Sequence, residues 1–106
     1  MNTYELAARL WQVLISAAHN RQVLTYELAG KPLGLGPNTL SDHLGKIQHY
    51  CERNQLPLLP ILVVSKETGR PGPGFPAVKD LDIERERVFA HHWFGMKPPA
   101  AVDFQA

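Results

Sequence analysis

This sequence of 106 residues has few of the features that would assign a function directly. It contains a single cysteine, Cys51, so it cannot build an internal disulfide framework, and we expect a reducing, cytoplasmic location. Its longest strongly apolar stretch, LPLLPILVV at residues 56–64, is too short to span a bilayer and contains two prolines. The first residues lack a basic segment followed by an apolar run, so we expect no signal peptide.

Motifs for catalysis or metal binding are also missing. The sequence has no Walker loop, no H-E-x-x-H motif and no Ser/His/Asp set at a recognisable spacing. Cys51 falls on an apolar stripe, and we expect a small buried hydrophobe rather than a nucleophile. His91 and His92 are adjacent, so they point to different sides of a helix and are poorly placed to share a metal ion. We therefore predict a protein that is not an enzyme and that uses no cofactor or metal.

Positive charge is scarce overall, since the formal net charge is +1 at pH 7. Its distribution is uneven: residues 20–79 hold seven Lys or Arg against four Asp or Glu, whereas residues 80–106 hold three against five. A mildly basic middle and a mildly acidic end permit a nucleic-acid-binding face without requiring one.

The features that are present indicate one small globular domain, with 44% hydrophobic and 20% charged residues. The string TYELA occurs twice, at residues 3–7 and 25–29. Thr3 is expected to cap a helix over residues 4–19, and Thr25 to cap a shorter helix that Gly30 ends. The sequences that follow the two copies diverge at once, so the shared string indicates helix capping rather than a repeat architecture.

A third helix is predicted after GKPLGLGPN, a stretch whose glycines and prolines require a turn. Pro37 precedes this helix, and Asn38 or Thr39 is expected to cap it. Its apolar residues fall at helical spacing and predict a buried stripe of Leu40, Leu44, Ile47 and Cys51. The opposite face is expected to carry Ser41, Asp42, His43, Lys46, His49 and Arg53.

The last third of the sequence changes period. Residues 61–65 are largely β-branched and predict a strand, followed by a KETG turn and an irregular hairpin through RPGPGF. Asp80 is expected to cap a final helix over residues 81–94, with core contacts from Leu81, Val88, Phe89 and Trp93. We expect an α+β, winged-helix-like helix-turn-helix domain over residues 1–94, with a short β-hairpin and a C-terminal helix, and an extended tail over residues 95–106.

Residues 24–75 also resemble a known family. The stretch LTYELAGKPLGLGPNTLSDHLGKI and the later NQLPLLPILVVSKETGRPGPGF are similar to the C-terminal domain of O6-alkylguanine-DNA alkyltransferases and alkyltransferase-like proteins. That family has T-Y-G-x-[IL]-A, a recognition helix, N-x-L-P, P-C-H-R-V-V and a G-x-x-G-F turn. The matching positions are Thr25, Tyr26, Leu28, Ala29, Leu40, Leu44, Asn54, Leu56, Pro57, Val63, Val64, Gly72, Gly74 and Phe75.

This sequence departs from the family at its reactive centre. LLPIL stands in place of the P-C-H-R segment, so no thiol lies there to accept an alkyl group. Asn38 stands where the family has an arginine that enters the base stack, which argues against base flipping. The string LPxLxxLVVxKxTGxPGxGF is also similar to small domains of phage and restriction-nuclease-associated proteins, which implies a role in phage–host conflict.

These observations leave two functions open. The first is a DNA-binding module that places the third helix in the major groove and the wing on the phosphate backbone. Its candidate contacts are Asn38, Thr39, Ser41 and Lys46 on the helix and Lys66, Thr68 and Arg70 in the wing. The alternative for both surfaces is an ordinary solvated helix face and hairpin, and Asp42 on the helix would repel a phosphate.

The second function is a small phage-encoded inhibitor that binds a host nucleic-acid-processing protein complex, of the anti-restriction or anti-CRISPR type. Large apolar residues near the chain ends are candidates for a partner surface or a homodimer contact, unless the terminal helices bury them. They are Trp11, Trp93, Phe94, Met96 and Phe104.

Overall fold

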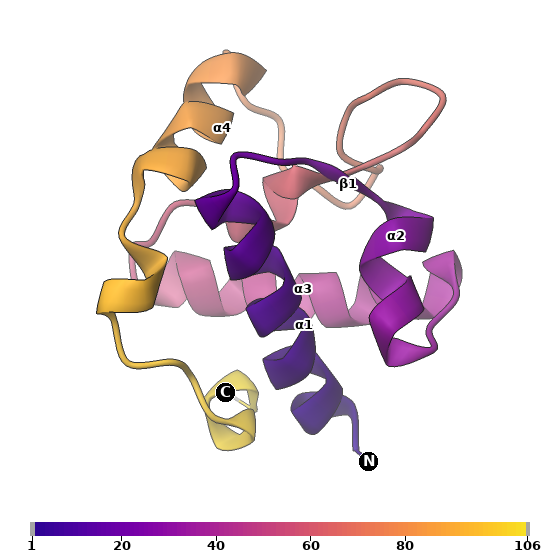
Figure 1. Ribbon diagram of the computed structural model, residues 1–106, viewed down its shortest axis with the longest axis vertical. Helices are drawn as coiled ribbons and strands as arrows, with labels where there is room; N and C mark the ends of the chain where they lie inside the picture. The colour runs from indigo at the N-terminus through magenta and orange to yellow at the C-terminus, as the bar shows by residue number, and fades with distance from the viewer. Residues whose placement is uncertain (1, 106) are drawn as a thin grey trace.

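A computed structural model describes residues 2–105 of the chain. Within this range the chain forms four α-helices and a small two-stranded parallel sheet, so the fold is of the α+β kind (Figure 1). The α-helices and strands are α1 (Thr3–His19), β1 (Leu24–Thr25), α2 (Tyr26–Gly30), α3 (Pro37–Arg53), β2 (Val63–Val64) and α4 (Leu81–Ala90). Short 3-10 helices are η1 (Lys31–Leu33), η2 (Leu59–Leu62), η3 (Trp93–Gly95) and η4 (Ala101–Phe104).

The core forms where α1 crosses α3 (Figure 1). Trp11 of α1 is fully buried there, and its ring meets Tyr50 and Trp93 edge-to-face at centroid distances of 5.4 and 5.5 Å. Leu40, Leu44, Ile47 and Cys51 of α3 are all buried, so the predicted stripe is confirmed. Burying one large apolar side chain contributes roughly 1.5–3 kcal/mol, so this crossing contributes substantially to stability.

The two TYELA copies do begin helices, but their caps differ. The Thr25 hydroxyl accepts the Leu28 N–H at 3.2 Å, which confirms Thr25 as a cap. The cap of α1 is Asn2 instead of the predicted Thr3, since the Asn2 side chain accepts the N–H groups of Tyr4 and Glu5 at 3.0 and 2.9 Å. Asn is as strong a cap as Thr, and it places Glu5 where its carboxylate completes a capping box.

The predicted start of α3 is also two or three residues too late. Gly36 is its N-cap and Pro37 its first residue, in place of a cap by Asn38 or Thr39. Proline suits this position, because its fixed φ is already helical and its missing N–H would have no partner there. His43 was expected on the outer face but is only 4% exposed, with Nδ1 3.3 Å from the Thr3 hydroxyl.

The predicted strand at residues 61–65 is shorter and pairs differently. Leu59–Leu62 form a 3-10 helix, and only Val63–Val64 are extended. They pair in parallel with β1, Leu24 opposite Val63 and Thr25 opposite Val64, and β1 was not predicted as a strand. The expected antiparallel hairpin is reduced to an isolated bridge between Val64 and Pro71, because the prolines that follow cannot donate to a ladder.

The last helix begins as predicted and ends early. The Asp80 carboxylate accepts the N–H groups of Asp82 and Ile83, so the cap is confirmed, but α4 stops at Ala90 rather than at residue 94. Trp93 is buried in η3 and donates its indole N–H to the Val88 carbonyl at 2.7 Å. The chain then folds back as η4 instead of running as an extended tail, and Phe104 is 4% exposed.

The division into a domain over residues 1–94 and a tail over residues 95–106 stays a prediction. Across the part of the chain that the structure describes, no helix has the length and apolar character needed to cross a bilayer.

Candidate nucleic-acid interface

The turn over residues 65–70 is the most exposed of the predicted contact segments. Lys66, Thr68 and Arg70 all lie on its surface. Backbone hydrogen bonds close the turn: the Ser65 N–H donates to the Arg70 carbonyl at 2.9 Å, and the Gly69 N–H donates to the Ser65 carbonyl at 2.8 Å. The turn therefore holds its three predicted contact residues together on an ordered backbone.

The turn carries two cations against one carboxylate, which is Glu67. The Ser65 hydroxyl donates to Glu67 Oε2 at 2.8 Å, and this bond lowers the pKa of Glu67 from its ordinary value of 4.5. Glu67 is therefore ionised at neutral pH and is engaged with its own turn. Lys66 and Arg70 remain directed to solvent, where they can meet a polyanion.

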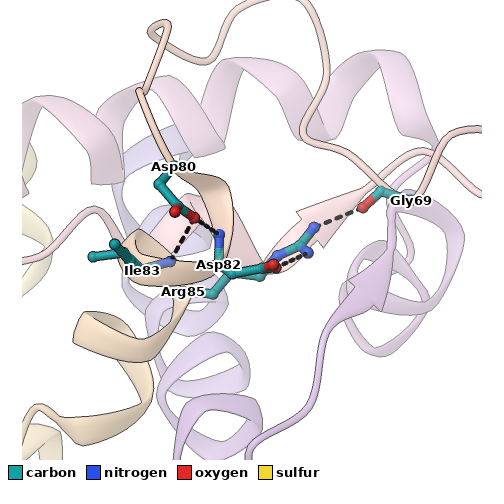
Figure 2. Close-up of polar contacts among 5 residues, drawn as sticks. All are labelled: Gly69, Asp80, Asp82, Ile83 and Arg85. Carbon is teal, nitrogen blue, oxygen red and sulfur yellow. Dashed lines mark hydrogen bonds and ion pairs between the residues drawn. The ribbon is translucent and has the colours of Figure 1, made fainter.

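Two contacts from other elements hold the loop that contains this turn. The Gly72 N–H donates to the Tyr26 hydroxyl of α2 at 2.9 Å. Arg85 of α4 donates from Nη2 to the Gly69 carbonyl at 2.6 Å (Figure 2). A loop rich in proline and glycine is thus anchored on two helices rather than by a full hairpin ladder.

The first turn of α3 presents a second set of predicted residues. Asn38, Thr39 and Ser41 are exposed, and the Ser41 hydroxyl donates to the Pro37 carbonyl at 3.3 Å. Among the described residues, no side chain caps this end of α3, so the backbone N–H groups of Asn38 and Thr39 are open to an anion. Lys46 lies apart from them, with Nζ 5.8 Å from the Tyr4 ring centroid of α1.

A groove of about 150 Å³ joins α3 to the loop that follows the turn. Ser41, Gly45 and Gln48 line one wall, and residues 71–75 line the other. Tyr26, Leu44, Pro60 and Val63 complete the lining. Among the described residues, Ser41 is the only predicted contact residue that borders this groove, and Gly45 and Gln48 were not predicted. Their spacing from Ser41, at i+4 and i+7, could have indicated a shared face.

Reactive groups lie elsewhere and are shielded. Cys51 is fully buried, and desolvation raises the pKa of its thiol to about 11, so the nucleophilic thiolate is suppressed at neutral pH. Burial, and then the neighbouring His92, lower the pKa of His91. Among residues 2–105, no three His, Cys, Asp or Glu side chains gather closely enough to hold a metal ion.

The large apolar residues near the chain ends divide into two groups. Trp11, Trp93 and Phe104 are buried, and Met96 is half-buried against the core. Phe94 is 55% exposed, as is Ile83 on the outer side of α4. Most of the large apolar residues near the chain ends are therefore packed in the core, and Phe94 faces solvent.

Comparisons with known proteins give no relative to guide the assignment: no family model, no curated protein and no solved structure matches this chain.

Proposed function

We propose that this chain is a DNA-binding module of the winged-helix kind that carries out no chemistry, in a phage, mobile-element or defence setting. In this proposal α3 is the recognition helix and the 65–70 turn is the wing. The observation that supports it best is the pairing of an uncapped, exposed helix start with an exposed cationic turn. Both lie on the same side of the molecule, on either side of α2 (Figure 1).

The two surfaces offer different contacts to a duplex. Lys66 and Arg70 would bind phosphates, with Thr68 beside them, and the free N–H groups at Asn38 and Thr39 would bind a further phosphate. The Asn38 amide has the donor and acceptor pair that recognises adenine in the major groove. Ser41 lies on the groove side of α3, and Lys46 would serve phosphates flanking the site.

Charge reversal in the turn tests this proposal. We expect the double variant Lys66→Glu and Arg70→Glu to lose duplex binding in a fluorescence anisotropy titration, because two phosphate contacts become repulsive. Both side chains are exposed, so the circular dichroism spectrum and Tm should not change. The matched control, Arg9→Glu with Lys97→Glu, makes the same charge change at exposed positions outside the interface. Equal losses in the two double variants would reject the assigned surface.

One observation favours the second candidate, an inhibitor that binds a nucleic-acid-processing protein complex. Phe94 and Ile83 are each 55% exposed, and aromatic side chains such as Phe94 are enriched at the centres of protein interfaces. Changing both to serine should leave DNA binding intact if the first proposal is right. If wild-type protein binds no duplex at low salt, the partner-binding candidate becomes the better one.

A further inference from the structure

We propose that Arg85 of α4 is a positioning residue for the wing: it fixes the peptide plane between Gly69 and Arg70 and thereby sets where the predicted phosphate contacts point. This inference rests on the function proposed above. The inference goes beyond that function because it assigns a role to Arg85, a cation that would not itself contact DNA.

Arg85 is held inward, unlike its neighbour on the same helix. Its side chain is 19% exposed, and its Nη2 donates to the Gly69 carbonyl at 2.6 Å. Its Nε is out of contact with solvent and has no hydrogen-bond partner among residues 2–105. The side chain of Arg87, by comparison, is 67% exposed. Figure 2 shows the Arg85 guanidinium reaching from α4 across to Gly69.

The peptide that Arg85 holds is one that could otherwise rotate. Gly69 has φ +69°, in the left-handed region where glycine moves freely. The carbonyl of this peptide accepts from Arg85, and its N–H, which belongs to Arg70, donates to the Thr68 hydroxyl at 3.1 Å. The peptide is therefore held at both ends, one end by its own turn and the other by α4.

The N-terminus of α4 is itself held by a cap. The bond from Arg85 to Gly69 therefore gives the 65–70 turn a defined position. Asp80 caps the first turn of α4 through Asp82 and Ile83 (Figure 2). Asp82 Oδ1 lies 3.9 Å from Arg85 Nη1, but the Asp82 side chain is 95% exposed, so this pair adds little. Among the described residues, the bond from Arg85 to Gly69 is the hydrogen bond that joins the turn to α4. Losing it should leave the turn able to sample other orientations, which lowers affinity by reducing the fraction ready to bind.

The test compares Arg85→Gln with Arg87→Gln, because both remove a cation from the same helix. We expect lower ¹⁵N order parameters for Thr68, Gly69 and Arg70 in R85Q without DNA, and unchanged values in R87Q. Duplex affinity should fall roughly three- to tenfold in R85Q, with an unchanged slope of log Kd against log salt. Arg70→Gln should lower that slope by about one, as expected for a lost phosphate contact. Arg85→Lys keeps the charge and a flexible aliphatic stem but loses the planar guanidinium, and should give intermediate order parameters.

Each outcome bears on the inference. Wild-type order parameters for the turn in both R85Q and R85K would overturn it. A slope in R85Q lowered as far as in R70Q would also overturn it, because Arg85 would then be a phosphate contact itself. If R85Q does not fold, the order parameters of R85K decide the inference, because R85K keeps the charge and its salt slope does not distinguish the two roles. If wild-type protein binds no duplex, the proposed function fails, whereas the relaxation measurement still decides whether Arg85 orders the turn.

Discussion

At the residue scale, the loop over residues 71–75 packs so closely on Tyr26 that Gly72 cannot carry a side chain without disturbing the contact. A Cβ added at Gly72 would lie 2.0 Å from the Tyr26 hydroxyl oxygen, which accepts the Gly72 N–H. We expect Gly72→Ala to lower the free energy of unfolding by about 1–3 kcal/mol, since the hydrogen bond and the packing are both disturbed. Gly74→Ala is the matched control, because no atom of residues 2–105 lies within 4 Å of its added Cβ. Urea denaturation should separate the two variants, and equal stabilities would contradict the assigned contact.

His43 gives the residue-scale prediction for pH. Desolvation by burial, reinforced by Lys46, lowers the pKa of His43 from its ordinary value of 6.5. The folded state therefore binds the proton less readily than the unfolded state does. Stability should be full above pH 6.5 and should fall as the pH drops below that value toward the lower folded pKa. His91 acts in the same direction, so His43→Gln should reduce the difference in unfolding free energy between pH 7.5 and pH 5 without removing it.

At the element scale, the start of α3 combines a stability function with the proposed binding function. Gly36 provides no side-chain cap, and in the described part of the chain no atom lies within 4 Å of a Cβ added there. We expect Gly36→Asp to stabilise the protein by a few tenths of a kcal/mol through capping and the helix dipole. The same carboxylate would occupy the N–H groups assigned to a phosphate and should weaken duplex binding. Gly36→Ser caps without the charge and should weaken binding less. A tighter complex with G36D would contradict the assigned role of this helix end.

The sequence predicts those elements that short-range interactions determine, and it does not predict those that depend on distant segments. The caps at Thr25 and Asp80 and the stripe of α3 follow from short-range rules, and the structure confirms them. The parallel pairing of Leu24 with Val63 joins segments about forty residues apart and leaves no local pattern. The burial of His43 depends on the packing of α1 against α3, although its spacing of three residues from Leu40 and four from Ile47 already places it beside the buried stripe.

The same distinction holds for the site. Lys66, Thr68 and Arg70 share a turn that the Gly and Pro residues predicted locally. The groove beside Ser41 and the contact from Arg85 to Gly69 arise only once distant segments meet. Sequence reasoning could therefore propose the charged contacts but could not find the residues that hold them in place.

At the scale of the whole molecule, the C-terminal segment closes the core. The Phe104 ring lies 5.3 Å from Tyr50 and 6.3 Å from Trp11 between centroids. We expect Phe104→Ala to cost about 3–5 kcal/mol of unfolding free energy, a large share of the stability of a small domain. Val102→Ala is the control, since Val102 is 64% exposed and should cost little. A thermal melt in which F104A and V102A coincide would show that this segment does not support the core.

At the scale of the whole molecule, the central claim is that this protein binds duplex DNA although its net charge is only +1. A salt titration of wild-type protein against duplex DNA tests that claim most directly. Contacts from Lys66, Arg70 and the neighbouring cations should give a slope of log Kd against log salt of roughly two to three. The account predicts measurable binding at low salt that weakens along this slope. An absence of binding at the lowest salt, or an affinity that does not change with salt, would contradict it.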